Sequence, residues 1–465
     1  MIKKNTKSII ILTILLGLTL STLFPLSIQA ISSVTDPDEP IPSQSFSVVE
    51  LWKYNITSDS HKMVMSADLS SIALTNDTHI LFFNSSSNST LWTYDMGYGS
   101  SHVDISADGE YIIAGLWNGT IYLFNKSVTV PKKPILKYDI GGPTRDVAIS
   151  GNGDYIAATS GTPNNTLYLF NNSNPSGPVL TWKYNASNGL DYDGLAISAT
   201  GEYITMLGYF EVYLFNNSYA DPKTPVWMNT TTYSAGGIDI SPDGDYIVAG
   251  EGNPGSDEGY IHLFDNTYST TKQAIWSYPT NCDMGKAAIS ANGNYVAVSK
   301  NSDNSPVINS TLYYLSTTGS NPKTSLWEYE CKTNSPEFRT ISITADGKYI
   351  AAGTGGVPTA YMFNSDASAS KQPLWTAIGN VVDIQLSLDG RYMCLHRNNF
   401  GTDGIYGNLT FYQVNLPSYN GGEKDDDDDD ETQVGLIPMG YYFLPITLFG
   451  IAALTILIKR KVSNT

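Results

Sequence analysis

The chain is poor in basic side chains. Its 465 residues include 26 lysines and arginines against 44 aspartates and glutamates, which gives a formal net charge of −18. Nucleic-acid binding requires clustered Lys and Arg that neutralise phosphates, and the basic residues are scattered here. The composition therefore argues against a nucleic-acid partner.

Cysteine and histidine are also scarce, with three and five residues. No two cysteines are adjacent, no histidines have the spacing of metal ligands, and neither a Gly-x-Ser-x-Gly turn nor a phosphate-binding glycine loop occurs. We therefore predict no catalytic residues, metal ligands or cofactor, and we expect the protein not to be an enzyme. A site assembled from distant segments would escape such a search.

Both ends of the chain carry membrane signals. Residues 1–30 have a basic start, an apolar run from Ile9 to Phe24 and a small residue for cleavage at Ala30, which predicts a signal peptide, with an uncleaved anchor as the alternative. Residues 434–458 are uncharged and mostly apolar, which predicts a transmembrane helix, and the basic residues of 459–465 predict a cytoplasmic tail. We therefore expect a single-pass membrane protein with its bulk outside the cytoplasm.

Two linkers are expected to flank the central region. Residues 31–47 form the first. Residues 417–433 form the second and contain an unbroken aspartate run, Asp425 to Asp430. Because like charges repel, such a run stays extended and solvated. We interpret it as a stalk between the central region and the membrane.

One turn motif recurs through residues 48–416. It reads Ser-Ala-Asp-Gly at 106–109 and Ser-Pro-Asp-Gly at 241–244, and related copies occur at 66–69, 151–153, 199–201, 291–293, 345–347 and 388–390. Short alternating strands flank each copy, and Asp, Asn and Gly adopt the positive φ of a tight turn cheaply. The period matches the roughly 40–50 residues of a four-stranded propeller blade.

Each repeat continues with two further strands. The third ends in an aromatic signature such as Tyr-Leu-Phe-Asn at 213–216, and the fourth is marked by a tryptophan such as Trp227. A large aromatic ring can fill the wedge that opens between neighbouring blades away from the axis. The tryptophans are therefore predicted to be core residues.

The repeat count predicts an all-β, eight-bladed β-propeller. Seven blades is the alternative, because the copy at 66–69 is degenerate. The eighth repeat lacks a tryptophan strand, and a matching segment precedes the first repeat at 49–54. We predict that this N-terminal strand pairs with the last blade and closes the ring, which removes the exposed sheet edges of an open one.

The repeats resemble those of WD40-like and quinoprotein-like (PQQ-like) propellers. The residues that carry the resemblance are the turn at 241–244, Gly-Thr-Ile-Tyr-Leu-Phe at 119–124 and Leu-Trp-Glu-Tyr at 326–329. A tryptophan in the fourth strand is more similar to the quinoprotein type, which also favours eight blades. That resemblance would imply a quinone held by calcium, stacking aromatics and often a vicinal cysteine pair. The vicinal pair is missing, and no cation-ligand set can be matched.

The innermost strands supply the candidate binding residues. On the face expected to point to the axis, four aspartates ring the channel and two arginines stand at its entrance: Asp104, Asp146, Asp239, Asp383, Arg145 and Arg339. The same row includes Lys62, His102, Gly194 and Lys286. We predict either a water-filled channel with locally paired charges or a cation or polar-ligand site at its mouth.

Two modifications are also predicted. Cys282 and Cys331 follow the tryptophan strands of consecutive repeats, and a disulfide between them is plausible in an exported protein. Asn-x-Ser/Thr sequons recur at the end of the third strand, which predicts glycosylation of Asn84, Asn125, Asn171 and Asn216.

These features predict a glycosylated binding or scaffold module at the cell surface, in a pattern that resembles archaeal surface proteins. Its partner would be a protein or a glycan, and the C-terminal helix would hold it in the membrane. Two alternatives remain: a quinoprotein-like oxidoreductase or other propeller enzyme with a site at the channel mouth, and an envelope-assembly factor.

Overall fold

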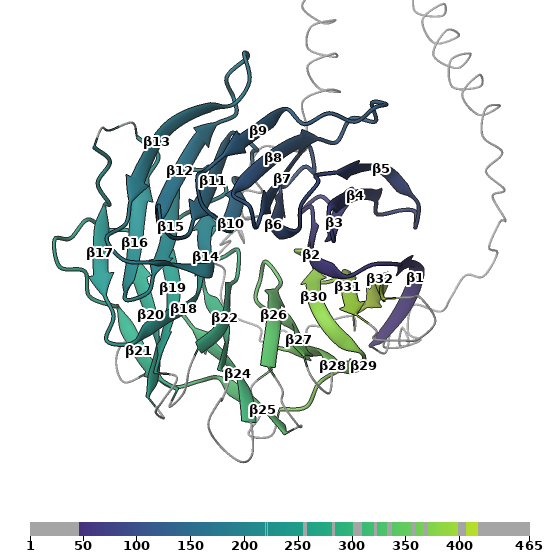
Figure 1. Ribbon diagram of the computed structural model, residues 1–465. Coiled ribbons are helices and arrows are strands. Elements are labelled where there is room, and N and C mark those ends of the chain that lie inside the picture. The colour runs from purple at the N-terminus through teal and green to yellow at the C-terminus, as the bar shows by residue number, and fades with distance from the viewer. Residues whose placement is uncertain are drawn as a thin grey trace, which may run out of the picture. The chain divides into compact units, whose positions relative to one another are not determined.

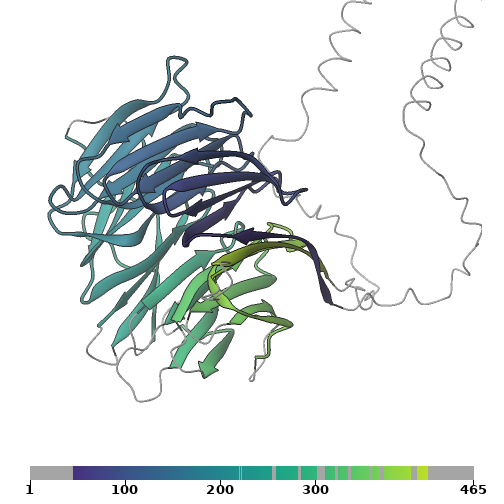
Figure 2. The same ribbon diagram turned by 45° about the vertical axis from the view of Figure 1, so that its right-hand side comes forward.

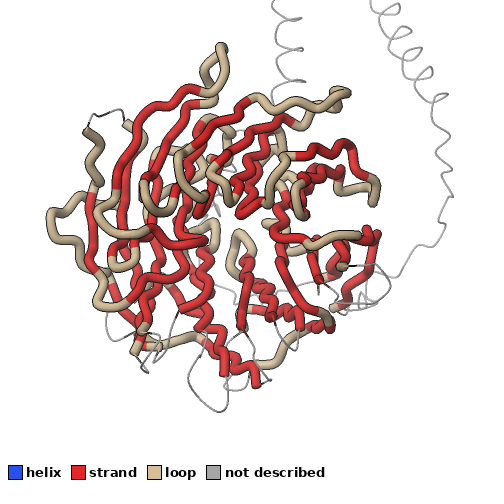
Figure 3. Tube along the Cα trace, viewed as in Figure 1, coloured by secondary structure: helices blue, strands red, loops and turns tan. Residues whose placement is uncertain are grey.

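The computed structural model describes residues 46–416, except 219, 221, 254–257, 281–283, 301–308, 320–322, 333–336, 356–358, 367–370 and 399–405. This part of the chain contains strands and loops but no helix (Figure 3). It accordingly offers no helix that is long and apolar enough to cross a membrane. The signal peptide predicted at 1–30 and the transmembrane helix predicted at 434–458 lie outside the described residues.

Eight antiparallel sheets of four strands each surround a common axis, so the eight-bladed propeller is confirmed (Figure 1). Blades one to four comprise β2 (Ser60–Met65), β3 (Ser71–Asn76), β4 (His79–Asn84) and β5 (Thr90–Asp95); β6 (Ser100–Ile105), β7 (Tyr111–Leu116), β8 (Thr120–Asn125) and β9 (Leu136–Asp139); β10 (Thr144–Ile149), β11 (Tyr155–Ser160), β12 (Thr166–Asn171) and β13 (Val179–Asn185); β14 (Leu190–Ile197), β15 (Tyr203–Gly208), β16 (Glu211–Asn216) and β17 (Trp227–Thr230).

Blades five to eight comprise β18 (Ser234–Ile240), β19 (Tyr246–Gly252), β20 (Gly259–Asp265) and β21 (Trp276–Pro279); β22 (Met284–Ile289), β23 (Tyr295–Lys300), β24 (Asn309–Ser316) and β25 (Trp327–Lys332); β26 (Glu337–Ile343), β27 (Tyr349–Gly355), β28 (Thr359–Asn364) and β29 (Trp375–Ile378); β30 (Asn380–Leu386), β31 (Tyr392–Asn398), β32 (Gly407–Asn415) and β1 (Ser47–Ile56).

The last blade takes its outer strand from the start of the chain. β1 pairs antiparallel with β32 from Ser47 opposite Asn415 to Ile56 opposite Gly407, and Figure 2 shows the two strands side by side. The innermost strand of the first blade, β2, also contacts β30 and β31 of the eighth. The predicted closure of the ring by the N-terminal strand is thus confirmed.

The recurring turn is held by its own side chains. In the second blade the Ser106 hydroxyl donates to Oδ1 of Asp108 at 2.7 Å and accepts the N–H of Tyr111 at 3.0 Å. The glycine between them, Gly109, has a φ of +66°. In the degenerate first copy Leu69 takes this left-handed position with a φ of +62°. The motif therefore fixes a backbone shape, and the copy at 66–69 keeps that shape without the glycine.

The turn glycine also fits against the preceding blade. A Cβ added to Gly244 would lie 2.6 Å from Cδ2 of Tyr203, the first residue of the second strand in the blade before. The same glycine–tyrosine contact recurs at five other junctions: Gly153 with Tyr111, Gly201 with Tyr155, Gly293 with Tyr246, Gly347 with Tyr295 and Gly390 with Tyr349. In these blades the tyrosine that follows the turn is thus a contact residue between blades.

The tryptophans fill the wedge between blades, as predicted. Trp227 in β17 is 2% exposed, and its ring centroid lies 5.3 Å from that of Phe264 in the next blade. Corresponding pairs join Trp92 with Phe124, Trp182 with Phe215 and Trp327 with Phe363. The aromatic signature of the third strand therefore supplies the surface that receives the tryptophan.

Most of these tryptophans also contact a lysine over the ring face, a contact that was not predicted. Lys132, from the loop after β8, lies with Nζ 4.4 Å from the Trp92 ring centroid and donates to the carbonyls of Asn125 and Ser127. The arrangement recurs in four later blades, where Lys223, Lys272, Lys323 and Lys371 cover Trp182, Trp227, Trp276 and Trp327. Each lysine follows the last residue of its third strand by seven positions, a regularity that the sequence already contains.

Replacing the turn glycine tests the glycine–tyrosine contact. Gly244→Ala should lower the free energy of unfolding by about 2–4 kcal/mol, because it adds strain at a φ of +80° and a clash with Tyr203. Gly97→Ala is the matched control, since Gly97 has a φ of +78° but no neighbour within 4 Å; a loss of about 1–2 kcal/mol is expected. Equal losses in chemical denaturation would contradict the inter-blade contact.

Replacing the buried lysine tests the lysine–tryptophan contact. Lys132→Ala should cost about 1–3 kcal/mol, because it uncovers Trp92 and removes the hydrogen bonds to the carbonyls of Asn125 and Ser127. Lys126→Ala in the same loop removes an exposed lysine that pairs with Glu110 at 3.2 Å, and should change stability by less than about 0.5 kcal/mol. The midpoints of thermal unfolding would show whether the two variants differ in this way.

Candidate binding site around the propeller axis

The innermost strands bring the predicted site residues to the axis in two layers. β2, β6, β10, β14, β18, β22, β26 and β30 lie next to one another in this order, and β30 returns to β2. Asp104 and Asp239 belong to the layer near the recurring turns. Asp146 and Asp383 lie two residues earlier along their strands, nearer the opposite end. The four aspartates therefore do not form one site.

Asp104 and Asp239 connect neighbouring blades. Asp104 accepts the N–H of Ile149 in the next blade at 2.8 Å, and Asp239 accepts that of Ile289 at 2.9 Å. Gln385 makes the equivalent bond to the N–H of Met65 at 2.7 Å. Burial raises the pKa of Asp104 to about 7 and that of Asp239 to about 6. Both carboxyls therefore have a local structural partner.

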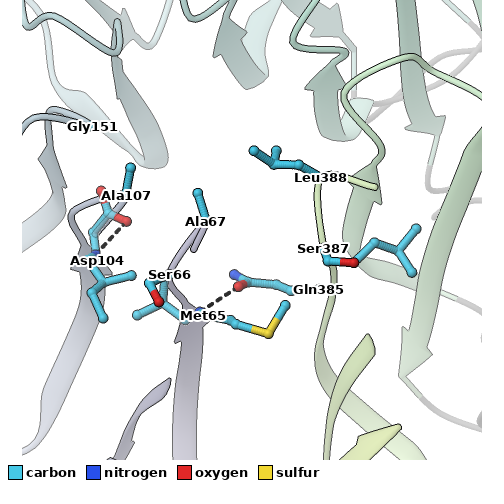
Figure 4. Close-up of a pocket in the computed structure, with 12 residues that line it drawn as sticks. Met65, Ser66, Ala67, Asp104, Ala107, Gly151, Gln385, Ser387 and Leu388 are labelled. Carbon is cyan, nitrogen blue, oxygen red and sulfur yellow. Dashed lines mark hydrogen bonds between the residues drawn. The ribbon is translucent and has the colours of Figure 1, made fainter. Parts of the chain in front are cut away.

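A small hollow lies at the turn end of the axis. It has a volume of about 260 Å³ and is lined by residues of blades one, two, three and eight. Figure 4 shows Asp104 on one side and Gln385 with Ser387 on the other, with Ser66 and Ala67 between them. This is below the roughly 300–1,000 Å³ of sites that enclose drug-sized ligands, so its size suits waters or a small polar molecule.

Asp146 and Asp383 lie near an ionic network whose centre is Asp193. Oδ1 of Asp193 lies 2.9 Å from Nζ of Lys62 and 2.7 Å from Nε2 of His102, and its Oδ2 contacts Nζ of Lys286. These three partners come from blades one, two and six, whereas Asp193 belongs to blade four. One carboxylate thus connects four blades.

The charges in this network shift one another. Burial alone would raise the pKa of Asp193, but Lys62, Lys286 and His102 together hold that pKa well below its usual range. Burial raises the pKa of Asp146, against the opposing effect of His102, whose Nε2 lies 3.9 Å away. Burial also raises the pKa of Asp383, which accepts a hydrogen bond from the Thr340 hydroxyl at 2.7 Å. Charged side chains are therefore paired locally in this network.

Asp193 reaches the axis because β14 bulges. Leu190 pairs with Gly208 and Leu195 with Met206, so four residues of β14 lie opposite the single Leu207. The other innermost strands are irregular at the same place, but β6, for example, has only one surplus residue between Ser100 and His102. Asp193 has a φ of +52°. A left-handed backbone costs a non-glycine residue about 1–2 kcal/mol, which the three ionic contacts offset.

The same bulge of β14 places the exposed side chain of Tyr192 beside Arg145, one of the two arginines predicted to stand at the channel entrance. The Arg145 guanidinium stacks on the Tyr192 ring at 3.7 Å, and the Tyr192 and Trp117 rings lie 5.5 Å apart. Tyr192 and Trp117 are 44% and 41% exposed, and Nε and Nη1 of Arg145 have no hydrogen-bond partner among the described residues. We call these three residues the aromatic rim. Arg339, the other predicted arginine, is exposed in β26, and its guanidinium packs on Gly355.

One buried pair has the residue types of a nucleophile and a base. Oγ of Ser60 and Nε2 of His396 lie 2.6 Å apart, and the Ser60 hydroxyl donates to Oδ1 of Asn398 at 2.7 Å. The imidazole must therefore donate to Ser60, the reverse of what a general base does. Both side chains are buried, and burial lowers the pKa of His396 to about 3. The pair thus joins the first and eighth blades as a structural bond.

Three further features concern metal ligation, the predicted disulfide and the predicted glycosylation sites. Within the described ranges, no three His, Cys, Asp or Glu side chains meet in a way that could hold a metal ion. The buried Cys331 thiol lies 3.2 Å from the Tyr361 hydroxyl, and Cys282 lies outside the described residues, so their disulfide stays a prediction. Oδ1 of each predicted glycosylation site accepts a hydrogen bond from the serine two residues later: Asn84, Asn125, Asn171 and Asn216.

The pKa shifts of Asp104 and Asp239 predict a pH dependence. Both groups hold their proton to a higher pH in the folded state than in the unfolded chain, so they contribute most stability below about pH 4 and lose it as the pH rises through 6 and 7. Asp104→Asn/Asp239→Asn removes both titrations but weakens hydrogen bonds to the backbone, at about 1 kcal/mol each. The variant should therefore be less stable than wild type at pH 4 and more stable than wild type at pH 8, because the wild type loses more stability over this range than the weakened hydrogen bonds cost. Parallel stability curves would contradict these shifts.

No protein-family model matches the chain, and no curated protein matches it. Among solved structures, the chain is similar to Sqt1 of Chaetomium thermophilum bound to the N-terminus of the ribosomal protein L10, with a TM-score of 0.61 at 10% identity over 79% of this chain and 100% of that one. It is also similar to the C-terminal WD40 domain of Sif2, with a TM-score of 0.57 at 11% identity over 80% and 99%. For BamB from Moraxella catarrhalis the TM-score is 0.55 at 13% identity over 79% and 100%. At these identities the similarity shows the fold alone, and the chain has the WD40-type β-propeller fold.

Proposed function

We propose that the protein is a binding module displayed at the cell surface, and that its aromatic rim contacts a partner protein. The observation that carries the proposal is the Trp117–Tyr192–Arg145 cluster at one end of the axis, in which both aromatic side chains are exposed. Trp, Tyr and Arg are the residue types most enriched where binding energy concentrates in interfaces. Arg145 stacks on the Tyr192 ring at 3.7 Å and holds it beside Trp117.

Two further features support this function. A ring of blades is a rigid support, and three different blades contribute the residues of the rim. The related fold of Sqt1 was solved with the N-terminus of a ribosomal protein bound. Surface display is supported by the sequence alone, through the signal peptide predicted at 1–30 and the membrane helix predicted at 434–458.

Trp117→Ala/Tyr192→Ala tests the rim in the region 32–422, purified from the protein's own cell envelope. Partners that co-purify with the wild-type region should fall at least about tenfold with this variant, since loss of two such anchors exceeds 1.4 kcal/mol. Quantitative mass spectrometry of the purified complexes measures the change. The two substitutions should leave the propeller fold intact. Circular dichroism and thermal unfolding would verify that the variant is folded.

Tyr268→Ala is the matched control for this experiment. Tyr268 is 74% exposed and lies in the loop after β20, at the other end of a blade from the hairpin loop that carries Trp117. Recovery of partners should be unchanged with it. Equal recovery with the rim variant and the wild type would show that the partner binds elsewhere, and a co-purifying quinone would instead favour the enzyme.

A further inference from the structure

Three cationic or potentially cationic side chains from three blades converge on one carboxylate. We propose that Lys62, His102 and Lys286 form a carboxylate-binding site near the axis, and that Asp193 is a built-in occupant which an acidic residue of a partner peptide replaces. The inference rests on the proposed function only for the existence of that partner.

The contacts have the geometry of a bound ligand. Lys62 and His102 approach Oδ1 of Asp193 at 2.9 and 2.7 Å, and Lys286 contacts Oδ2, so both oxygens are used. Charge-assisted hydrogen bonds of this kind are about twice as strong as neutral ones. None of the three partners belongs to the blade that carries Asp193. The site would therefore persist as a cationic cluster if that one side chain left.

The segment that carries Asp193 has the properties of a displaceable element. The pairs Leu190–Gly208 and Leu195–Met206 flank the bulge, so it can change shape without altering the register of β14. Asp193 is held at a φ of +52°, a strained conformation that is relieved when it leaves. Its side chain is 32% exposed, and those of Lys62 and Lys286 are 29% and 26% exposed, so a ligand can reach the same atoms.

The resident group indicates the class of ligand. Asp193 is part of a short peptide in which a tyrosine precedes the acid, and Tyr192 packs on Arg145 within the aromatic rim. A partner peptide with an aromatic residue next to Asp or Glu would satisfy both the rim and the cations.

Nearby acids leave the site cationic when Asp193 is removed. Asp146 lies 3.9 Å from His102, and Asp383 also acts on Lys62. Burial raises the pKa of both acids, and among the described residues neither forms an ion pair with Lys62 or Lys286. An added carboxylate therefore has two lysine charges to bind.

Asp193→Gly tests the site, because glycine accepts the left-handed backbone at this position and the variant loses only the carboxylate. In the region 32–422, sodium acetate should raise the unfolding midpoint of Asp193→Gly by at least about 2 °C more than sodium chloride of equal ionic strength. Wild type should show no such difference. Asp77→Gly is the matched control, since Asp77 is an exposed aspartate with a φ of +34°, and acetate should not stabilise it selectively.

A peptide provides the second measurement. The acetylated and amidated segment 191–194, Asp-Tyr-Asp-Gly, should bind Asp193→Gly at least about tenfold more tightly than it binds wild type or Asp193→Gly/Lys286→Met. Acetate stabilisation that is equal in all variants, or peptide binding that is indifferent to Lys286, would overturn the carboxylate site and leave Asp193 a purely structural contact. Neither readout depends on the partner proposed for the rim, so the two proposals fail separately.

Discussion

Each blade of this propeller depends on its neighbours for cover. A twisted sheet whose inner strand lies near the axis leaves a gap that widens outwards, and apolar faces along that gap must be buried. Here the gap is filled by a tryptophan of one blade between a phenylalanine and a lysine of the next. Nearer the axis, the turn glycines and their tyrosine partners make the same junction close enough to exclude a Cβ. These contacts stabilise the ring because most junctions repeat them.

The repeated contacts explain why the fold was readable from the sequence. The recurring turn, the phenylalanine of most third strands and the tryptophan of most fourth strands are local features with fixed spacing, so the repeats could be counted from the sequence. The missing fourth strand of the last repeat placed the N-terminal strand against β32. The lysines that cover the tryptophans also recur at a fixed distance, seven positions after the third strand. They were not predicted, because a position in a loop follows neither the period of a strand nor that of a helix.

The site was less predictable, for a reason that lies in β14. The alternation of side chains along the strand predicted that Gly194 faces the axis. The bulge of β14 has two more surplus residues than that of β6, and it brings Asp193 to the axis instead. The contacts of Asp193 with blades one, two and six, and of Tyr192 with Trp117, depend on the path of that bulge across the ring. The four predicted aspartates do face the axis, yet their partners in neighbouring blades divide them between two layers. Such non-local partners cannot be read from one strand at a time.

The pairing of Ser47 with Asn415 has a consequence for the order of events in folding. β1 is synthesised before the other strands of the propeller but pairs with β32, which is synthesised last. The eighth sheet therefore cannot be completed until nearly the whole propeller has been synthesised. Until then β1 and the side of the first blade that contacts the eighth lack their partners, and unpaired edges of this kind promote aggregation. The closing strand therefore also sets the length of time during which the nascent ring is vulnerable, and a chain shortened by only its last strand would lose the anchor of its first.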